Sequence, residues 1–395
     1  MQTVANELNK SYTLQQLVSY FFKLGYSGFG GPVALVGYMH RDLVEERGWI
    51  TEQEYKEGLA LAQLAPGPLA AQLCIYLGYV HYKILGATLA GLAFVIPSFI
   101  MVVLLGMVYK LFGGLPWMQS VFYGVGAAVI GIIAFSSYKL SIKSVGKLSL
   151  IDVKKNWILW LFYICAAIIT WFTESEQVIY FILAGLIYMF IKAPPRWNSN
   201  RKTVAGLLVF LNIGFWEYKP GILSQMAIFF TKAGAFVFGS GLAIVPFLHG
   251  SVVKEFHWLN EQQFVDAVAV AMITPGPVVI TVGFIGYLVA GFPGATVAAL
   301  ATFLPCYLFT VIPAPYFKRI SNNLSVKYFV EGITAAVVGA LIGSVIIISR
   351  RTILDINTAG IALVTVLAIL KFHKLKEPYI ILVAALIGFI LKTFL

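Results

Sequence analysis

Long apolar stretches, separated by short polar segments, run through the whole sequence. Residues 58–82, 84–109, 111–138, 157–173 and 267–317 contain no charged side chain, and the last stretch is long enough for two helices divided at residues 291–294. A helix needs about 20 mostly apolar residues to cross the hydrocarbon core of a bilayer. The pattern therefore predicts an all-α polytopic membrane protein.

The second half of the sequence repeats the first half. At an offset of 209 residues, 19 of the 53 positions from Gln16 to Pro68 are identical, and beyond them the register continues at an offset of 208. Self-similarity of this kind indicates a duplicated structural unit. We expect a first repeat over residues 1–195, a linker with a short apolar segment over 196–224, and a second repeat over 225–395.

The charges of the loops indicate how the two repeats are oriented, because Lys and Arg mark the cytoplasmic side of a membrane. Segment 139–156 carries five lysines and segment 112–117 carries none, whereas the counterpart of 112–117 in the second repeat holds Lys318, Arg319 and Lys327. Arg350 and Arg351 favour the opposite assignment. The balance favours inverted topology, with six membrane segments in each repeat and one linker segment between them. Secondary transporters often use this plan.

Composition excludes a soluble protein and several kinds of site. Hydrophobic residues make up 59% of the chain and charged residues 11%, whereas about a quarter of the residues in soluble domains are charged. The excess of 28 Lys and Arg over 17 Asp and Glu lies in short loops, which is typical of membrane topology rather than of nucleic-acid binding. The N-terminal segment shows no basic region leading into an apolar one, so we expect no cleaved signal peptide. The three cysteines lie apart in apolar stretches, which favours neither disulfides nor a metal site.

Glycine clusters interrupt the first apolar segment of each repeat. They stand in Phe29-Gly30-Gly31-Pro32 and in Phe238-Gly239-Ser240-Gly241. Glycine releases the backbone from helical dihedral angles, and proline suits the first turn of a new helix. The clusters therefore predict a broken helix, with close packing of helices through small residues as the alternative.

A second break follows a helix start in each repeat. Thr51 and Asn260 each stand three residues before a Glu or Gln, which is the pattern of a capping box. The helices so begun reach Pro66-Gly67-Pro68 and Pro275-Gly276-Pro277, where proline removes a backbone donor. Unwound backbone is tolerated at membrane depth only where protein buries it or where it lines an aqueous cavity. We expect discontinuous helices here, with a simple proline kink as the alternative.

Charged residues occupy equivalent positions beside these breaks. Helix N-termini that point into the membrane favour anions, and Lys23 and Lys232 flank the two glycine clusters. An ionisable side chain among apolar residues is functional by default, although a lysine can also extend to the membrane interface. Glu57 and Asp266 stand nine residues before each Pro-Gly-Pro. They complement the helix dipole, carry a coupled proton or neutralise the lysines.

These motifs resemble the chromate ion transporter family over most of the chain. The resemblance rests on Phe29-Gly30-Gly31-Pro32, on the glycine cluster at 238–241, on both Pro-Gly-Pro tripeptides and on flanking stretches at 48–52, 61–65 and 77–79. It implies a long-chain, two-domain, multi-pass protein of the bacterial inner (plasma) membrane that exports chromate, a tetrahedral dianion, at the expense of the proton-motive force. Leu69-Ala70-Ala71 replaces small polar residues of the family and Ser240 replaces a glycine, so sulfate or another oxyanion stays open as the substrate.

The expected site places the oxyanion near the bilayer midplane between the repeats, in contact with backbone N–H groups of both breaks. The expected substrate-binding residues are Lys23, Ser27, Phe29, Gly30, Gly31, Pro32, Gln63, Pro66, Gly67, Pro68, Lys232, Phe238, Gly239, Ser240, Gly241, Thr274, Pro275, Gly276 and Pro277. Glu57 and Asp266 are the expected coupling residues, with a proton as the coupling ion.

Other classes of function fit the sequence less well. A membrane-embedded enzyme would need clustered carboxylates or paired histidines for a metal, and the four aspartates are scattered. The phosphate-binding pattern G-x-x-x-x-G-K-[ST] does not occur, so we expect no ATP hydrolysis. We also expect no enzyme activity, no cofactor and no nucleic-acid partner. An oxyanion exchanger and a passive anion channel remain alternatives. The sequence also leaves a homodimer open.

Overall fold

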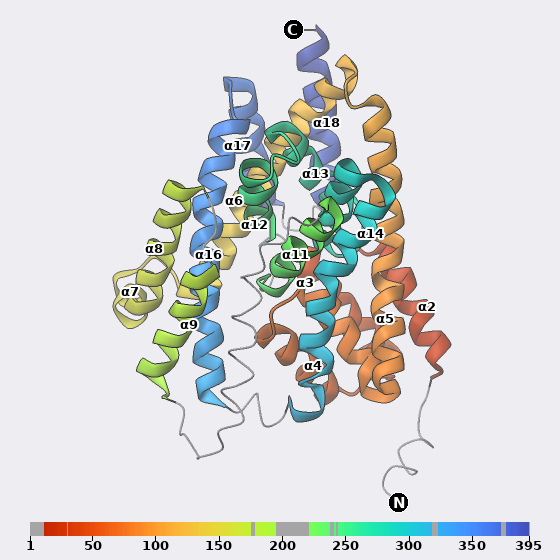
Figure 1. The fold of residues 1–395 in the computed structure, drawn as a ribbon, viewed down its shortest axis with the longest axis vertical. Helices are drawn as coiled ribbons and strands as arrows, with labels where there is room; N and C mark the ends of the chain where they lie inside the picture. The colour runs from red at the N-terminus through yellow and green to blue at the C-terminus, as the bar shows by residue number, and fades with distance from the viewer. Residues whose placement is uncertain are drawn as a thin grey trace, which may run out of the picture.

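The computed structural model describes residues 12–29, 31–174, 178–194, 221–237, 241, 244–317, 323–372 and 377–394, and every regular element within them is helical (Figure 1). The first repeat contains α2 (Leu14–Ser27), α3 (Gly31–His40), η1 (Arg41–Glu46), α4 (Glu52–Leu64), α5 (Leu69–Phe112), α6 (Pro116–Val145), α7 (Leu150–Lys155), α8 (Trp157–Thr173) and α9 (Val178–Lys192). The second contains α11 (Ile222–Ala235), α12 (Ile244–His249), η4 (Gly250–Glu255), α13 (Glu261–Ile273), η5 (Val278–Ile280), α14 (Thr281–Val311), η6 (Ala314–Tyr316), α16 (Leu324–Thr352), α17 (Ile356–Lys371) and α18 (Glu377–Phe394). The all-α prediction is confirmed, and the predicted linker segment at 203–216 lies outside the described residues.

Several helices are suited to a bilayer. Segments 69–112, 116–145, 278–316 and 324–352 are long and apolar enough to cross a membrane. Large apolar side chains on the outside of the helices are strongly exposed, for example Leu111 at 75%, Phe172 at 76% and Leu363 at 61%. Lipid tails can surround such apolar side chains without a cost in free energy. The chain is therefore a multi-pass membrane protein.

The helices α5 and α14 fold back on themselves at equivalent positions. Lys83 in α5 and Gly291 in α14 have left-handed backbone angles, with φ of 52° and 63°. A methyl group on Gly78 would overlap the carbonyl oxygen of Gly86, and Gly286 meets Gly294 in the same way. Eight residues span about 12 Å in a straight helix, so these contacts require a reversal. Each long helix is a short arm followed by a longer one, as the sequence division at 291–294 predicts.

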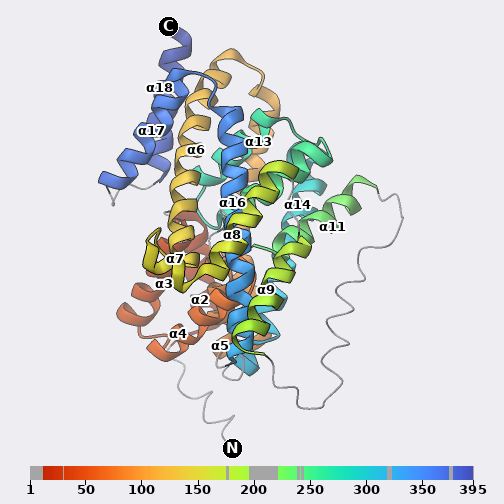
Figure 2. The same cartoon turned by 90° about the vertical axis from the view of Figure 1, so that its left-hand side faces the viewer.

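The two repeats exchange helices. The helices α6 and α16 lie side by side at the centre of the molecule (Figures 1 and 2). In the second repeat α16 packs against α8 and α9 of the first repeat, while α6 of the first packs against α17 and α18 of the second. Gly339 of α16 lies against the carbonyl of Tyr163, and Gly124 of α6 lies against Gly388. Small residues bring these backbones together, and the two repeats form one interlocked body.

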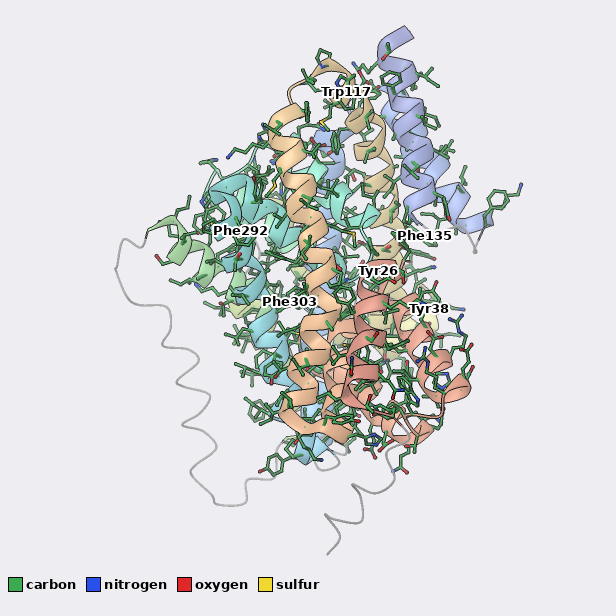
Figure 3. All side chains as sticks on the ribbon, turned by 90° about the vertical axis from the view of Figure 1, so that its right-hand side faces the viewer. Tyr26, Tyr38, Trp117, Phe135, Phe292 and Phe303 are labelled. Carbon is green, nitrogen blue, oxygen red and sulfur yellow. The ribbon has the colours of Figure 1, made fainter. Side chains whose placement is uncertain are left out.

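Equivalent long helices run in opposite directions. Figure 3 shows the chain descending from Trp117 to Phe135 along α6 and from Phe292 to Phe303 along α14. The helix α5 ends at Phe112, four residues before α6 begins, so its longer arm rises towards the end of the molecule that holds Trp117. The longer arms of α5 and α14 are thus antiparallel.

Capping side chains begin the helices that lead to the Pro-Gly-Pro breaks. Thr51 accepts a hydrogen bond from the backbone N–H of Glu54, and the Glu54 side chain accepts one from the backbone of Thr51. Asn260 and Gln263 form the same reciprocal pair at the start of α13. Both predicted capping boxes are confirmed. They fix where α4 and α13 start, and therefore where each helix meets its break.

Candidate functional site

The breaks of one repeat are hydrogen-bonded to the breaks of the other. The N–H of Gly67 donates to the carbonyl of Val237 at 2.5 Å, and the N–H of Gly276 donates to the carbonyl of Gly28 at 2.9 Å. Gly67 and Gly276 are equivalent in the two repeats, as are Gly28 and Val237. Each Pro-Gly-Pro tripeptide therefore crosses the glycine break of the other repeat. We refer to residues 28, 29, 31, 32, 66–68, 237 and 274–277 as the crossing.

A small pocket lies at the crossing. It measures about 30 Å³ and is lined by Gly28, Phe29, Gly31, Pro32, Met272, Thr274, Gly276, Val278 and Glu377. One water molecule occupies about 30 Å³ in the liquid, so the pocket in this conformation is too small for a tetrahedral oxyanion. Five of the expected site residues, from both repeats, meet here in a closed arrangement: Phe29, Gly31, Pro32, Thr274 and Gly276.

The beginning of α5 points unsatisfied donors at the crossing. Pro68 provides no side-chain cap, and the first bond within the helix runs from the N–H of Gln72 to the carbonyl of Pro68. Leu69, Ala70 and Ala71 are 8%, 2% and 1% exposed, and among the described residues no acceptor meets their N–H groups. Helix N-termini carry partial positive charge and bind anions. The electrostatics of this buried helix end suit a negative ligand.

Two of the expected N–H contacts are used within the protein. The N–H groups of Gly67 and Gly276 donate to the carbonyls of Val237 and Gly28, so in this conformation they are not available to an oxyanion. The reason is the exchanged packing of the repeats, which brings a carbonyl to each glycine. The next N–H groups along the chain, at the start of α5, have no acceptor among the described residues.

Several expected site residues do not line the central pocket. Lys23, Ser27, Gln63 and Lys232 are exposed, and the hydroxyl of Ser27 donates to the carbonyl of Lys23 at 2.7 Å. Their helices turn these side chains outward, while buried neighbours on the same helices face the core. Gly241 packs against Val279. Gly30, Phe238, Gly239 and Ser240 lie outside the described residues.

Each predicted coupling carboxylate lines its own cavity. Glu57 lies in a cavity of about 610 Å³ together with Gln53 and Tyr76, and Asp266 lies in one of about 870 Å³ together with Gln262 and Tyr109. The helices α4 and α13, which carry the two carboxylates, lie towards opposite ends of the molecule (Figure 1). Nine residues of helix, about 13 Å, separate each carboxylate from its Pro-Gly-Pro.

The two carboxylates have similar hydrogen-bond partners but unequal burial. Gln53 Nε2 donates to Glu57 Oε1 at 3.1 Å, and its counterpart Gln262 Nε2 donates to Asp266 Oδ1 at 2.8 Å. The hydroxyl of Tyr109 also donates to Asp266 Oδ2 at 2.7 Å. Asp266 is 2% exposed, whereas Glu57 is partly exposed.

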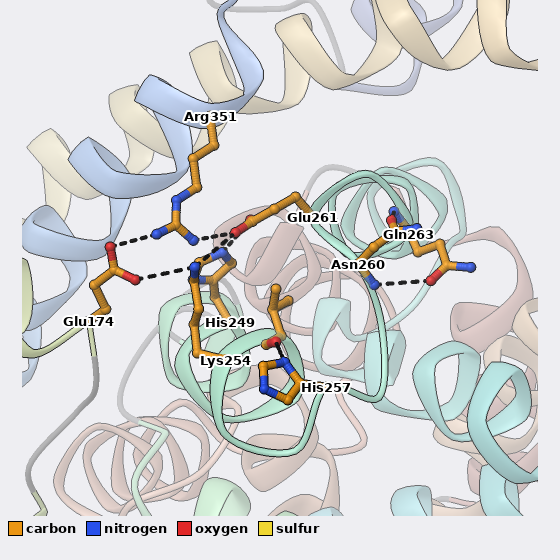
Figure 4. Close-up of polar contacts among 9 residues, drawn as sticks. Glu174, His249, Lys254, His257, Asn260, Glu261, Gln263 and Arg351 are labelled. Atoms are coloured by element: carbon orange, nitrogen blue, oxygen red, sulfur yellow. Dashed lines mark hydrogen bonds and ion pairs between the residues drawn. The ribbon is translucent and has the colours of Figure 1, made fainter.

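An ion-pair network fixes the start of α13 (Figure 4). Arg351 donates to Glu174 at 2.5 Å and also to Glu261, and His249 Nε2 lies 2.7 Å from the second oxygen of Glu261. Lys254 Nζ lies 3.5 Å from Glu174. The hydrogen bond from Arg351 lowers the pKa of Glu174, which lies in a loop. The network connects both repeats, because Glu174 belongs to the first and the other residues to the second.

Two polar residues, one partly exposed and one fully buried, were missed by the sequence reasoning. Glu377, the first residue of α18, reaches the central pocket beside Gly31. Gln72 is fully buried, its Nε2 donates to the carbonyl of Pro66 at 2.8 Å, and its Oε1 has no partner among the described residues. The available signal was a single polar residue inside or at the edge of an apolar stretch, which is costly in a membrane unless it has a role.

The chain is similar to known proteins over most of its length. The model of the chromate transporter family matches residues 15–190 and 224–389. The chain belongs to the chromate transporter family. The chromate transport protein of Cupriavidus metallidurans is 62% identical over 96% of this chain and 94% of its own length. The probable chromate transport protein of Synechococcus elongatus is 58% identical over 97% of both chains. The chromate transport protein of Pseudomonas aeruginosa is 29% identical over 95% of this chain and 92% of its own length.

No solved structure matches this chain. In this structure, some of the motifs by which the chain resembles the chromate transporter family meet at the crossing. Each Pro-Gly-Pro tripeptide donates a hydrogen bond to the other repeat, and Phe29, Gly31 and Pro32 line the central pocket. The family match in two segments agrees with the duplication in the sequence.

Proposed function

We propose that this member of the chromate transporter family is a secondary active transporter that exports chromate or a related tetrahedral oxyanion across the bacterial plasma membrane. The observation that carries the proposal is the pair of reciprocal hydrogen bonds between Gly67 and Val237 and between Gly276 and Gly28. They bring broken backbone from both repeats to one place inside the protein. Such sites at repeat interfaces bind substrate in secondary transporters.

The proposed oxyanion site is the crossing in a more open conformation. The buried start of α5 supplies N–H groups and the positive end of the helix dipole. Phe29, Gly31, Pro32 and Thr274 surround the pocket that would widen. A pocket of about 30 Å³ does not form an open pore, which supports a carrier over a passive channel. Thr274 lines the pocket, and its hydroxyl donates to the carbonyl of Ala271 at 3.0 Å in this conformation.

Inverted topology of the repeats is part of the proposal. The antiparallel run of the longer arms of α5 and α14 supports it (Figure 3), and so does the exchange of loop charges between the two sides. The cavities of Glu57 and Asp266, towards opposite ends of the molecule, fit two access routes to one crossing. We keep the expected arrangement of six segments, a linker segment and six segments.

Glu57 and Asp266 are the proposed proton-coupling residues. The assay is chromate and sulfate flux in proteoliposomes of the full-length protein, with and without an imposed pH gradient. We expect saturable chromate flux that the pH gradient drives, and we expect Glu57→Gln and Asp266→Asn to uncouple flux from the gradient without loss of folded protein.

Glu255→Gln is the matched control, because Glu255 is an exposed carboxylate on η4 and its replacement should leave coupling unchanged. Gradient-dependent flux in both amide variants would exclude the coupling role. Non-saturable conductance without coupling would instead indicate a channel, and sulfate flux in place of chromate flux would identify a different oxyanion.

A further inference from the structure

A cationic cavity lies beside the glycine break of the first repeat. It measures about 440 Å³ and is lined by Tyr20, Lys23, Leu24, Ser27, Gly28, Tyr38, Arg41, Asp42 and Arg47. Three cations face one carboxylate there. Water occupies about 30 Å³ per molecule, so the cavity has room for a hydrated tetrahedral anion. In Figure 3 Tyr38 lies at the outer edge of the first repeat, far from Phe292 on α14.

Two of the three cations of this cavity have uncharged counterparts in the second repeat. Arg41, Asp42 and Arg47 correspond to Gly250, Ser251 and Phe256 at the offset of 209. Tyr20 and Tyr38 likewise correspond to two phenylalanines, Phe229 and Phe247. The replacements fill the space, because the ring of Phe229 contacts those of Phe247 and Phe256 at centroid distances of 5.8 and 5.6 Å.

Duplication therefore leaves one repeat with a charged cavity and the other with an aromatic cluster. A cation that only anchored the fold in the membrane would be expected in either repeat. Of the three cations that line the cavity, only Lys23 has a charged counterpart, Lys232. The cavity is a property of the first repeat.

Aromatic rings hold Arg47 in place. Its Cζ lies 4.6 Å from the ring centroid of Trp49 and 5.4 Å from that of Tyr20. Within the described part of the chain Arg47 has no ion pair with a carboxylate. Stacking on rings orients a guanidinium and leaves its N–H groups free to donate. Arg47 is therefore positioned to receive an anion.

Arg41 and Lys23 complete the charge of the cavity. Arg41 pairs with Asp42 at 2.7 Å and lies 3.5 Å from Glu46, so it is partly neutralised. Lys23 stands on the polar stripe of α2, four residues before Ser27 and four after Ser19, and this stripe lines two adjoining cavities. With Arg47 these side chains leave a net positive charge for an anion.

The cavity ends at the crossing. Gly28 lines both the cationic cavity and the central pocket, and its carbonyl accepts the hydrogen bond from Gly276. A movement that breaks this hydrogen bond would open the cavity towards the pocket. An anion held by Arg47 and Lys23 would then have a short route to the start of α5.

We propose that Lys23, Arg41 and Arg47 form a loading site that binds the dianionic tetrahedral oxyanion before it reaches the crossing. The proposal rests on the proposed function and adds the residues that capture the substrate. Guanidinium groups bind tetrahedral oxyanions through paired N–H donors. The aromatic second repeat would offer no equivalent site, so capture occurs on one side of the carrier.

The test measures binding and transport by the full-length protein. Equilibrium dialysis with radiolabelled chromate in phospholipid-free maltoside micelles gives the Kd, and uptake into everted membrane vesicles gives KM and Vmax. We expect Arg47→Gln and Lys23→Gln each to raise Kd and KM about tenfold, the scale of one charge-assisted hydrogen bond, with Vmax nearly unchanged. Arg47→Lys should restore much of the affinity.

Two further variants make the test robust. Arg47→Phe introduces the residue that the second repeat holds at this position, so it is expected to fold and should weaken binding as Arg47→Gln does. Arg350→Gln removes an exposed arginine of α16 and should leave Kd and KM unchanged. If Arg47→Gln fails to fold, Lys23→Gln decides, because Lys23 is exposed and has no ion pair among the described residues.

Other outcomes overturn the loading site. Unchanged KM in folded Lys23 and Arg47 variants, with normal wild-type flux, would refute the site and leave the proposed function standing. An absence of wild-type chromate flux would instead refute the proposed function. A lipid headgroup offers the same phosphate chemistry, so displacement of chromate by low amounts of phosphatidylglycerol would assign the cavity to lipid. Altered membrane orientation with normal KM would make these cations topology signals alone.

Discussion

The repeat-equivalent glycines of the crossing should differ in their tolerance of a side chain. Gly276 has φ of 93° and Gly67 has φ of 141°, and both angles are unfavourable for alanine. A methyl group on Gly276 would overlap Ser98 Oγ and lie 3.1 Å from Ser98 Cβ. A methyl group on Gly67 would lie 2.7 Å from Nε2 of Gln72, the far end of a flexible side chain. The steric conflict at Gly276 is therefore harder to relieve.

The magnitudes follow from these two terms. Positive φ costs a non-glycine residue about 1–2 kcal/mol, and forcing an extra methyl group into a packed interior adds about 1–3 kcal/mol. Gly276→Ala should therefore destabilise by about 2–5 kcal/mol, and Gly67→Ala by about 1–3 kcal/mol. Ser98→Ala removes the overlapping oxygen, together with its 3.2 Å hydrogen bond to the carbonyl of Gly25.

Thermal unfolding of the purified protein in detergent measures the effect. We expect the Tm to fall further for Gly276→Ala than for Gly67→Ala, and the Gly276→Ala deficit to shrink when both proteins carry Ser98→Ala. Such coupling is expected of side chains in contact. Equal losses at the two glycines, or a deficit that Ser98→Ala leaves unchanged, would refute this account of the crossing.

Two further outcomes are expected from the structure. The pKa of Glu174 lies below its ordinary 4.5 because Arg351 donates to it, so its contribution to stability is present above pH 4.5 and is lost as the pH falls through the lowered value. Glu174→Gln should then have a lower Tm than the wild type at pH 7, and the difference should shrink as the pH falls below 4.5. A Tm difference that stays constant as the pH falls would contradict the assignment. Gly286→Val would overlap the carbonyl of Gly294 and should reduce the yield of monodisperse protein in size-exclusion chromatography, whereas Gly360→Val, at an open position, serves as the control that should not.

The sequence predicts the local breaks well because their causes are local. Proline lacks a backbone donor, and Thr51 and Asn260 cap the next helix through neighbouring atoms, so these features can be read without the fold. The division at residues 291–294 is equally local, since Gly291 supplies the left-handed angle. The antiparallel run of equivalent helices is compatible with the loop charges that the sequence displays.

Contacts between distant segments could not be predicted in the same way. The packing of α8 and α9 against α16 depends on which small residues of each helix meet. The apolar periodicity of these helices is compatible with several packing partners, so it does not identify the right one. The outward direction of Lys23 and Lys232 depends on which face of α2 and α11 is buried. The charges of Arg41 and Arg47 stand in a segment that reads as a loop, and only the fold places them beside Lys23.

The crossing combines a symmetric backbone with asymmetric side chains, and this combination bears on mechanism. Gly67 and Gly276 make equivalent hydrogen bonds because every residue has the backbone atoms that form them. The side chains beside them have diverged, as the unequal burial of Glu57 and Asp266 shows. A symmetric backbone gives two related arrangements of similar energy, and a carrier needs two such states. Since one carboxylate is buried at the wall of its cavity and the other is partly exposed, the structure has the asymmetry expected of one of these states.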